Sequence, residues 1–317
     1  LSIKFAFIEE YDLLFATSTP LSAGIPGIFA KWFSKKNFKF VFEVRDLWPE
    51  LPKALGLKNP ILLWSMNILE KISYKKSDAC IGLSPGICEG IKRKTPNGHL
   101  IEMIPNGCDL SLFKRDTKDR YEIEGVEPGD IVAIYPGVHG VANGLDSVLD
   151  MAKVLIERNI LNVKILFVGK GKQKSHLVRR VNKEKINNCI FLETVSKYEL
   201  NRIMNRADIG LMVLKNIPAF YYGTSPNKFF DYISASLPVI NNYPGWLADM
   251  ITEYECGVVS PPDNPHAFAD AVLKLANDTQ GRIQMGNNSR ALAEEKFSRE
   301  DLAAKFVTLL EEIKKPD

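Results

Sequence analysis

The sequence predicts an α/β protein made of two doubly wound parallel sheets. Short runs rich in Val, Ile and Phe alternate with helix-like segments along almost the whole chain, as in parallel sheets covered by helices. A charged stretch without hydrophobic periodicity, 113–130, divides this alternation into two parts. A chain of 317 residues, 45% hydrophobic and 25% charged, is ordinary for a globular protein of about two domains.

Composition excludes several classes of protein. A net charge of +3 gives no reason to expect nucleic-acid binding. No uninterrupted apolar run is long enough to span a membrane, and no signal peptide is visible. The cysteines are odd in number, 5, and form no Cys-x-x-Cys pair, so we expect reduced thiols in a cytoplasmic protein.

The first part of the chain predicts a small sheet. Its expected strands are 13–18, 38–45, 79–84 and 100–104, with helices at 23–33 and 61–76 and a third starting at Pro85. We expect residues 1–112 to form an N-terminal, acceptor-side domain. Because four strands make a small doubly wound sheet, this domain is expected to be truncated at its N-terminal side.

The second part predicts a full doubly wound sheet over residues 113–297. Its six expected strands are 131–135, 163–168, 189–192, 209–214, 238–242 and 257–260, and a helix fits between each neighbouring pair. A Ser298-x-x-Asp301 capping box opens the last helix. The apolar residues of that helix share one face, so segment 298–317 is expected to pack back on the first domain.

Ligands of such sheets bind at the carboxyl ends of the strands. The loop 136–144, "PGVHGVANG", contains three glycines and opens a helix, an arrangement that favours phosphate but also fits a plain tight turn. The loop 169–174, "GKGKQK", brings three lysines to another strand end, where they fit either an anion or a solvated surface.

The stretch "GTSPNKFFDY" gives the strongest signal. Ser225 is a good N-cap and Pro226 a good first helical residue, which places the cation Lys228 at the positive end of the helix dipole. A bound phosphate or diphosphate would remove that conflict. Asp231 follows on the same face, where a surface ion pair with Lys228 is the alternative. The apolar, aromatic "NIPAFYYGT" before it is typical of a pocket wall.

Two other segments have both a functional and a structural interpretation. "FVFEVRDLWPE" ends a strand on Arg45 and Asp46, where Asp46 could act as a base or orient an acceptor hydroxyl, or where the two could form a local salt bridge. Segment 28–40, "IFAKWFSKKNFKF", is typical of a membrane-interfacial segment but equally of a helix followed by a strand. The four histidines show no metal-ligand spacing, and only His139, in the glycine loop, is expected near a ligand.

Five segments together resemble glycosyltransferase family 4, which has the GT-B fold. They are "FEVRDLWPE", "SPGICEGI", "IPNGCDLSLF", "SPNKFFDYISASLPVI" and "ECGVVSPPDNPHAFADAV", in the family's order and over nearly the whole chain. The resemblance is closest to the branch that builds bacterial surface polysaccharides, including amino-deoxysugar (N-acetyl-fucosamine-type) transferases acting on lipid-linked acceptors. It implies two Rossmann-like domains that face a cleft.

The resemblance also implies roles for individual residues. Lys228 would stabilise the leaving diphosphate. Asp46, in the other domain, would act on the acceptor hydroxyl as a base or by orienting it. The donor-binding residues that it implies are Gly137, His139, Gly140, Gly169, Lys170, Val195, Gly223, Thr224, Ser225, Pro226, Asn227 and Asp231. Among these, Asp231 would take the ribose hydroxyls and Val195 would lie near the base. Transfer would retain the anomeric configuration and need neither metal nor cofactor.

The chain departs from the family's pattern in its first glycine loop and before Lys228. Many members have Glu where this chain has Gly223, so backbone groups of Gly223 or Thr224 would replace that side chain. Many also have Arg and Lys where this chain has Val138 and Asn143, which leaves more of the diphosphate charge to Lys228 and Lys170.

The function expected from these residues is transfer of a sugar, an N-acetylated or deoxy hexose, from a UDP donor to a lipid-linked or glycan acceptor in polysaccharide or lipopolysaccharide synthesis. The location expected is the cytoplasm, with peripheral contact to the inner leaflet of the cytoplasmic membrane. Two alternatives stay open: an epimerase acting on a UDP-amino sugar, which would need acid–base partners such as His139, and a non-catalytic donor-binding protein.

Overall fold

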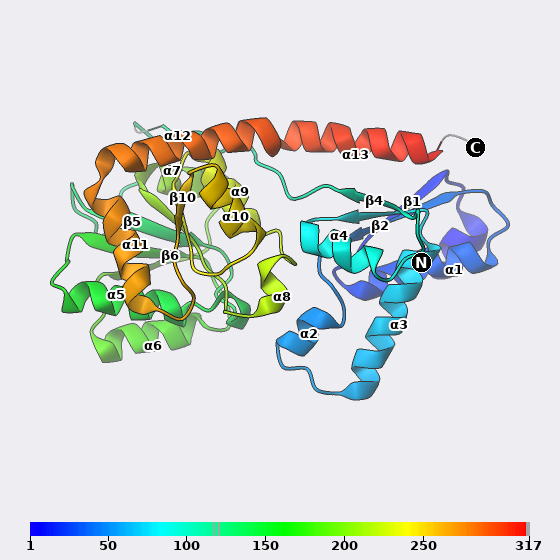
Figure 1. Ribbon diagram of the computed structural model, residues 1–317, viewed down its shortest axis with the longest axis horizontal. Coiled ribbons are helices and arrows are strands. Elements are labelled where there is room, and N and C mark those ends of the chain that lie inside the picture. The colour runs from blue at the N-terminus through cyan, green and yellow to red at the C-terminus, as the bar shows by residue number, and fades with distance from the viewer. Residues whose placement is uncertain (117, 120, 315–317) are drawn as a thin grey trace. The chain divides into compact units, whose positions relative to one another are not determined.

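The computed structural model describes residues 1–116, 118–119 and 121–314, and it divides the chain into two compact units (Figure 1). The first unit comprises Leu1–Asn106, Pro218–Ser225 and Glu300–Asp317, and the second comprises Gly107–Ile217 and Pro226–Arg299. These bounds differ from the expected domains at three points. Residues 107–112 and 298–299 lie in the second unit, and the segment Pro218–Ser225, expected in the second domain, belongs to the first.

The first unit is built on a four-stranded parallel sheet with the order β1-β2-β3-β4. Its strands are β1 (Leu13–Thr17), β2 (Lys39–Val44), β3 (Ala79–Gly82) and β4 (Leu100–Met103). Its helical segments are η1 (Lys4–Ile8), η2 (Leu21–Gly24), α1 (Ile25–Phe33), α2 (Glu50–Ala54), α3 (Pro60–Lys76), α4 (Pro85–Lys92), α8 (Pro218–Tyr221) and α13 (Arg299–Lys314). All four strands lie within the ranges expected from the sequence.

Alternating residues of β2 give this sheet two buried faces. Phe40, Phe42 and Val44 belong to a hydrophobic cluster with Tyr74 of α3. Val41 points to the opposite face, because successive strand residues alternate, and packs in a cluster with Leu309 and Ile313 of α13. The apolar face expected for the last helix is thus the face that covers this sheet, and it brings the end of the chain back to the first unit.

The second unit is built on a six-stranded parallel sheet with the order β10-β9-β8-β5-β6-β7. Its strands are β5 (Ile131–Pro136), β6 (Val163–Val168), β7 (Cys189–Leu192), β8 (Ile209–Met212), β9 (Val239–Asn241) and β10 (Gly257–Val259). Its helices are η3 (Val141–Asn143), α5 (Asp146–Glu157), α6 (Lys174–Glu184), α7 (Lys197–Arg206), α9 (Asn227–Ser234), α10 (Trp246–Glu253), α11 (Pro265–Asn277) and α12 (Thr279–Lys296).

The strand order creates a switch point between β5 and β8. The chain runs from β5 outward to β7 on one side and then returns to β8 and runs outward to β10 on the other. Ligands of doubly wound sheets bind at such a point, outside the carboxyl ends of the strands. The first glycine loop follows β5 and the segment leading to α9 follows β8, so the order of the strands places Gly137–Gly140 and the chain leading to Lys228 at the switch point. Gly169 and Lys170 follow β6, and Val195 follows the edge strand β7.

Helices pack on this sheet through a large buried cluster. α5 and α11 contact each other and contribute Val148, Leu155 and Val272 to a core shared with Phe167 of β6 and Leu211 of β8. α9 packs against α12. Among the described residues of both units, no helix combines the length and apolar character that crossing a bilayer requires.

Candidate functional site

The helix that carries Lys228 begins one residue later than expected. α9 spans Asn227–Ser234, its N-cap is Pro226, and no side chain in the described part of the chain caps it. The expectation that Ser225 caps this helix is therefore wrong. The Ser225 hydroxyl instead accepts a hydrogen bond from the Asn106 amide at 3.2 Å, within the first unit. The amides at the start of α9 are left without a side-chain acceptor, which is the state that suits an anion.

Lys228 is held against the first glycine loop. Its Nζ donates to Asn143 Oδ1 at 3.3 Å and lies 4.9 Å from the centre of the Tyr135 ring. Its Cε would stand 3.6 Å from a Cβ at Gly137, so loop and lysine are in close proximity. The ammonium forms no ion pair with any carboxylate of the described residues, and burial lowers its pKa to about 8. A half-buried cation without a counter-ion is ready to receive one.

The same loop is tied to the end of β5 by polar contacts. Tyr135 is fully buried, and its hydroxyl donates to the Val138 carbonyl at 3.1 Å. The Asn143 side chain donates to that carbonyl at 2.8 Å. Asn143 therefore links the loop to Lys228 through a neutral side chain. Sequence reasoning did not find Tyr135, because an aromatic residue at a strand end reads as core.

The two glycine loops pack directly on each other. The His139 amide donates to the Lys170 carbonyl, and the Gln173 amide donates to the His139 carbonyl, each at 2.9 Å. A Cβ at Gly169 would lie 2.2 Å from the Gly137 carbonyl oxygen, and one at Gly171 would lie 2.3 Å from that of His139. Glycine is required at both positions, because backbone atoms of the facing loop occupy the space.

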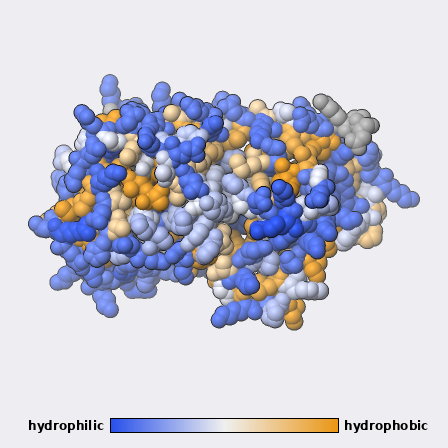
Figure 2. All heavy atoms as spheres, viewed as in Figure 1, coloured by the Kyte–Doolittle hydropathy of each residue, from blue (hydrophilic) through white to orange (hydrophobic). Residues whose placement is uncertain are grey.

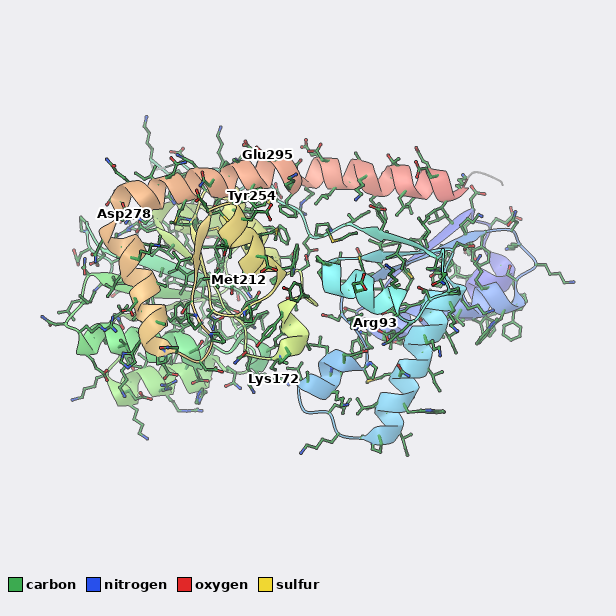
Figure 3. The ribbon with its side chains drawn as sticks, in the orientation of Figure 1. Arg93, Lys172, Met212, Tyr254, Asp278 and Glu295 are labelled. Carbon is green, nitrogen blue, oxygen red and sulfur yellow. The ribbon has the colours of Figure 1, made fainter. Side chains whose placement is uncertain are left out.

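The lysines of the second loop have different surroundings. Lys174 donates to the carbonyls of Gly169 and Leu192, each at 3.0 Å, and pairs with Glu193 at 2.8 Å, so it holds loop and strand ends together. Lys170 and Lys172 are exposed, and Figure 3 places Lys172 at the edge of the second unit. Of the three, Lys170 keeps the donor-binding role implied by the sequence as a prediction.

His139 lies beneath the first loop and not on it. Its ring is fully buried among the rings of Tyr135, Phe167 and Phe191, with centroid distances of 6.1, 6.0 and 6.2 Å. Neither ring nitrogen has a hydrogen-bond partner among the described residues. Burial, with a smaller contribution from Lys174, lowers its pKa to about 4, so the imidazole is neutral at neutral pH. A buried, neutral ring is poorly placed to serve as the acid–base group of an epimerase.

Asp231 is a half-buried residue of α9, three positions after Lys228. The two form no ion pair in the structure of the described residues, although a surface pair was one interpretation of their spacing. Burial raises the pKa of Asp231 to about 6, and the charges of Lys197 and Arg299 oppose that rise. Val195, partly buried, precedes Lys197 between β7 and α7. A half-buried carboxylate that accepts no side-chain hydrogen bond from the described part of the chain is suited to accept hydrogen bonds from hydroxyl groups of a ligand.

The segment before α9 is docked in the first unit. The Tyr222 carbonyl accepts hydrogen bonds from the Ser84 hydroxyl at 2.7 Å and from the Gly86 amide at 3.0 Å. A Cβ at Gly223 would lie 2.5 Å from the Ala219 carbonyl oxygen, so a glutamate could not replace Gly223 without moving α8. Thr224 donates to the Phe220 carbonyl at 2.9 Å. The expected residues Gly223, Thr224 and Ser225 therefore belong to a different unit from Pro226, Asn227, Lys228 and Asp231.

Asp46 follows β2 in the first unit. Burial raises its pKa, while a hydrogen bond from the Thr19 hydroxyl, at 3.3 Å, and the Arg45 charge lower it. Arg45 and Asp46 form no ion pair among the described residues, so the local salt bridge is not observed. The Arg45 amide donates to the Ser18 hydroxyl at 2.9 Å.

A buried glutamate that sequence reasoning missed fixes the loop after Asp46. Glu70 of α3 is fully buried and accepts hydrogen bonds from the Trp48 amide at 2.8 Å and the Tyr74 hydroxyl at 2.6 Å. It also pairs with Lys94, which donates to the Trp48 carbonyl at 3.1 Å. The signal was a charge inside the apolar run "WSMNILEKI" of a helix, but such a charge is usually solvated.

Metal ligation has no support in these side chains. Among the described residues, no group of three or more His, Cys, Asp or Glu side chains could hold a metal ion. The groups assembled in the second unit are an ammonium, uncapped helix amides and interlocked glycine loops. These are the groups that bind phosphate oxygens through hydrogen bonds and charge.

Comparison with known proteins finds similarity to glycosyltransferases. Residues 131–278 match a family model described as glycosyl transferases group 1, a segment that contains the whole six-stranded sheet. The capsular polysaccharide biosynthesis glycosyltransferase CapM of Staphylococcus aureus is 22% identical over 324 residues, which cover 96% of this chain and 79% of CapM.

Solved structures show the fold. Sucrose-phosphate synthase from Thermosynechococcus elongatus superposes with a TM-score of 0.78 at 18% identity, covering 96% of this chain and 74% of that one. Anabaena HepE in complex with UDP-glucose also gives 0.78, at 17% identity, covering 95% of this chain and 79% of that one. The chain has the GT-B architecture of two Rossmann-like units, as the sequence predicted.

Proposed function

We propose that this protein is a glycosyltransferase that moves a sugar from a nucleoside diphosphate donor to a glycan or lipid-linked acceptor. The observation that carries the proposal is Lys228, a half-buried ammonium with no carboxylate partner among the described residues, beside a glycine loop and an uncapped helix start. Support comes from the match of residues 131–278 to glycosyl transferases group 1 and from the likeness to CapM.

The donor is proposed to be a UDP-sugar, as for HepE, whose structure holds UDP-glucose. Its diphosphate would lie between Lys228, the amides of Asn227 and Lys228, and the loop Gly137–Gly140, with Gly169 and Lys170 behind. Asp231 would accept the ribose hydroxyls, and Val195 would lie against the base. The sugar would meet backbone groups of Gly223, Thr224 and Ser225. We further propose an N-acetylated or deoxy hexose as the sugar transferred.

In the proposed reaction these groups stabilise the negative charge of the leaving diphosphate. As the glycosidic bond to the diphosphate breaks, negative charge grows on the leaving oxygens, and a nearby ammonium stabilises it more than it stabilises the ground state. Lys228 is suited to this because its contacts, a neutral amide oxygen and a ring face, do not neutralise it. We propose that the configuration at the anomeric carbon is retained, that no metal takes part, and that Asp46 orients the acceptor hydroxyl.

The acceptor is proposed to belong to bacterial polysaccharide or lipopolysaccharide synthesis at the inner face of the cytoplasmic membrane. Two exposed apolar groups on the first unit support contact with a lipid surface: Trp32 and Phe33 on α1, 53% and 54% exposed, and Ile61 and Trp64 on α3, 76% and 64% exposed. Figure 2 shows hydrophobic residues at the surface of this unit beside hydrophilic ones. Lysines next to exposed aromatic residues favour anionic membranes.

A sedimentation assay tests the membrane contact. The protein is expected to sediment with vesicles that contain anionic lipid and to remain in solution with purely zwitterionic vesicles. The double variant Trp32→Ala, Trp64→Ala should lose most of that binding, because it removes two exposed aromatic side chains that would enter the lipid surface. It should still fold, because exposed side chains contribute little to folding. Equal binding of the variant would remove these residues from the proposal.

The replacement Lys228→Ala tests the donor site. Because a charged hydrogen bond to phosphate contributes roughly 1.5–3 kcal/mol, UDP should bind about 10- to 100-fold more weakly, and transfer should be lost. Lys172→Ala, which removes an exposed lysine of the second loop, is the matched control and should leave the affinity unchanged. Calorimetry with UDP that gives wild-type affinity for Lys228→Ala would falsify the donor site.

A further inference from the structure

A cavity of about 370 Å³ lies in the second unit, at the carboxyl ends of the strands. Its lining comes from the loops after β5, β6, β8, β9 and β10 and from the first turns of α5, α6 and α11, but it includes neither Lys228 nor Asp231 nor Gly137. The cavity therefore adjoins the proposed diphosphate site, with which it shares Gly140, but it is lined by a different set of side chains. Its volume is within the range of about 300–1,000 Å³ that is usual for small-molecule sites.

The floor and the rim of the cavity differ in chemistry. The floor is apolar and consists of the buried side chains Leu145, Leu177, Leu214 and Phe268. The rim is polar and includes the carboxylate of Asp263, which is exposed and accepts from Asn216 at 2.6 Å. A ligand that fits both would have an apolar face and hydroxyl groups around its edge, as a saccharide ring has.

The charges on the rim argue against a phosphate ligand. Asp146, Asp150 and Asp263 line the cavity with a single cation, Lys215. Arg180 pairs with Asp146 at 2.9 Å and also with Asp150, which leaves Asp263 as the carboxylate free of an ion pair among the described residues. Carboxylate and amide oxygens accept hydrogen bonds from hydroxyl groups and repel phosphate oxygens.

One wall of the cavity is shared with the donor site. Gly140, Val141 and Gly144 line the cavity, while Asn143, between them, accepts from the Lys228 ammonium at 3.3 Å. The wall is also tied to the next loop, because the Lys215 amide donates to the Ala142 carbonyl at 2.9 Å and Lys215 itself lines the cavity. A ligand in the cavity would thus contact the segment 140–144, whose Asn143 accepts the hydrogen bond from Lys228.

We propose that this cavity is a second ligand site, that it binds a neutral saccharide ring, and that its occupancy strengthens donor binding through residues 140–144. The coupling part rests on the proposed donor site; the binding part does not. Because coupling between two sites is reciprocal, UDP strengthens saccharide binding by the same factor.

The experiment follows amide NMR signals while glucose, N-acetylglucosamine or inorganic phosphate is added to the full chain. Either sugar should shift signals of cavity residues such as Leu177 and Phe268, also in Lys228→Ala, whose donor site is impaired. Asp263→Gly, which suits the φ of +53° at this position, should weaken sugar binding about tenfold or more. Asp270→Ala removes an exposed carboxylate that lines no part of the cavity and should bind sugar normally.

The outcomes separate the two proposals. Sugar-induced shifts confined to the neighbourhood of Lys228, shifts caused only by phosphate, or an unchanged affinity in Asp263→Gly would each overturn the saccharide site. Titration of UDP with and without saturating sugar measures the coupling, expected at about fivefold or more. Sugar binding at the cavity without any change in UDP affinity would overturn the coupling, while failure of Lys228→Ala to weaken UDP binding concerns the donor site alone.

Discussion

At the scale of single residues, the protein holds the charged side chain of Lys228 at a place where burial disfavours the charge. Lys228 has a pKa lowered to about 8 by burial, against an ordinary value of 10.5. Between these two values Lys228 is protonated in the unfolded chain but not in the folded one. Burial of the charge therefore lowers the free energy of unfolding fully below pH 8, and this loss disappears as the pH rises to 10.5. A bound diphosphate offsets that cost by restoring the charged form.

The affinity for UDP should therefore depend on pH above neutrality. Deprotonation of free Lys228 removes the counter-charge, so binding should be about tenfold weaker at pH 9 than at pH 7. UDP itself contributes little to this change, since its terminal phosphate titrates near a pKa of about 6. The measurement is calorimetry across this range.

The variant Lys228→Arg is the control for that titration. Arginine remains protonated throughout, so the affinity of this variant should be flat over the same range, whatever its absolute value. A similar decline in the arginine variant would assign the pH dependence to another group.

At the scale of elements, the proposed site of the second unit depends on the two glycine loops, 136–144 and 169–174, which pack directly on each other. Their mutual hydrogen bonds run between backbone groups of His139, Lys170 and Gln173, and glycines make the approach sterically feasible. A loop held in this way needs little ordering when a ligand arrives, which favours affinity. The buried ring of His139 fills the space beneath both loops.

The variant Gly171→Ala tests this fit. Its new methyl group would lie 2.3 Å from the His139 carbonyl oxygen, so the loops must separate. We expect a loss of about 1–3 kcal/mol in the free energy of unfolding, together with weaker UDP binding. Thermal unfolding and calorimetry measure the two effects.

Gly140→Ala provides the comparison within the same loops. Its Cβ would find the nearest atom at 3.5 Å, an ordinary contact, so the melting temperature should stay close to wild type. Equal destabilisation by both replacements would show that glycine is needed here for another reason than close packing.

At the scale of the whole molecule, the last helix completes the first unit. Leu309 and Ile313 of α13 pack on Val41, Ala79 and Ile81, after the chain has passed through the second unit. The stability of the first unit therefore depends on α13. Lys228 and Asp231, the proposed donor-binding residues, lie in the other unit, which has its own core.

The replacement Leu309→Ala should separate stability from donor binding. Removing a side chain that is 6% exposed should cost about 2–4 kcal/mol in the unfolding of the first unit. UDP affinity, measured below the unfolding transition, should remain that of the wild type. A parallel loss of UDP affinity would mean that the two units do not fold independently.

Much of the fold could be predicted from the sequence, because the strands are short apolar runs between clear breaks. β6 and β7 have the expected bounds, and the apolar face of α13 was visible in its spacing. The start of α9 was placed one residue early, since the Ser225 hydroxyl serves Asn106, a contact remote in sequence. The cavity was out of reach for the same reason, because its lining comes from five separate loops.

The first unit has a practical consequence for anyone who wishes to prepare half of this protein. It is assembled from three stretches of chain, and the short middle stretch, Pro218–Ser225, interrupts the second unit. No single cut of the gene yields either half intact. A fragment of residues 107–299 would still contain residues 218–225, which pack in the first unit. To obtain the second unit alone, these eight residues should be replaced by a short flexible linker.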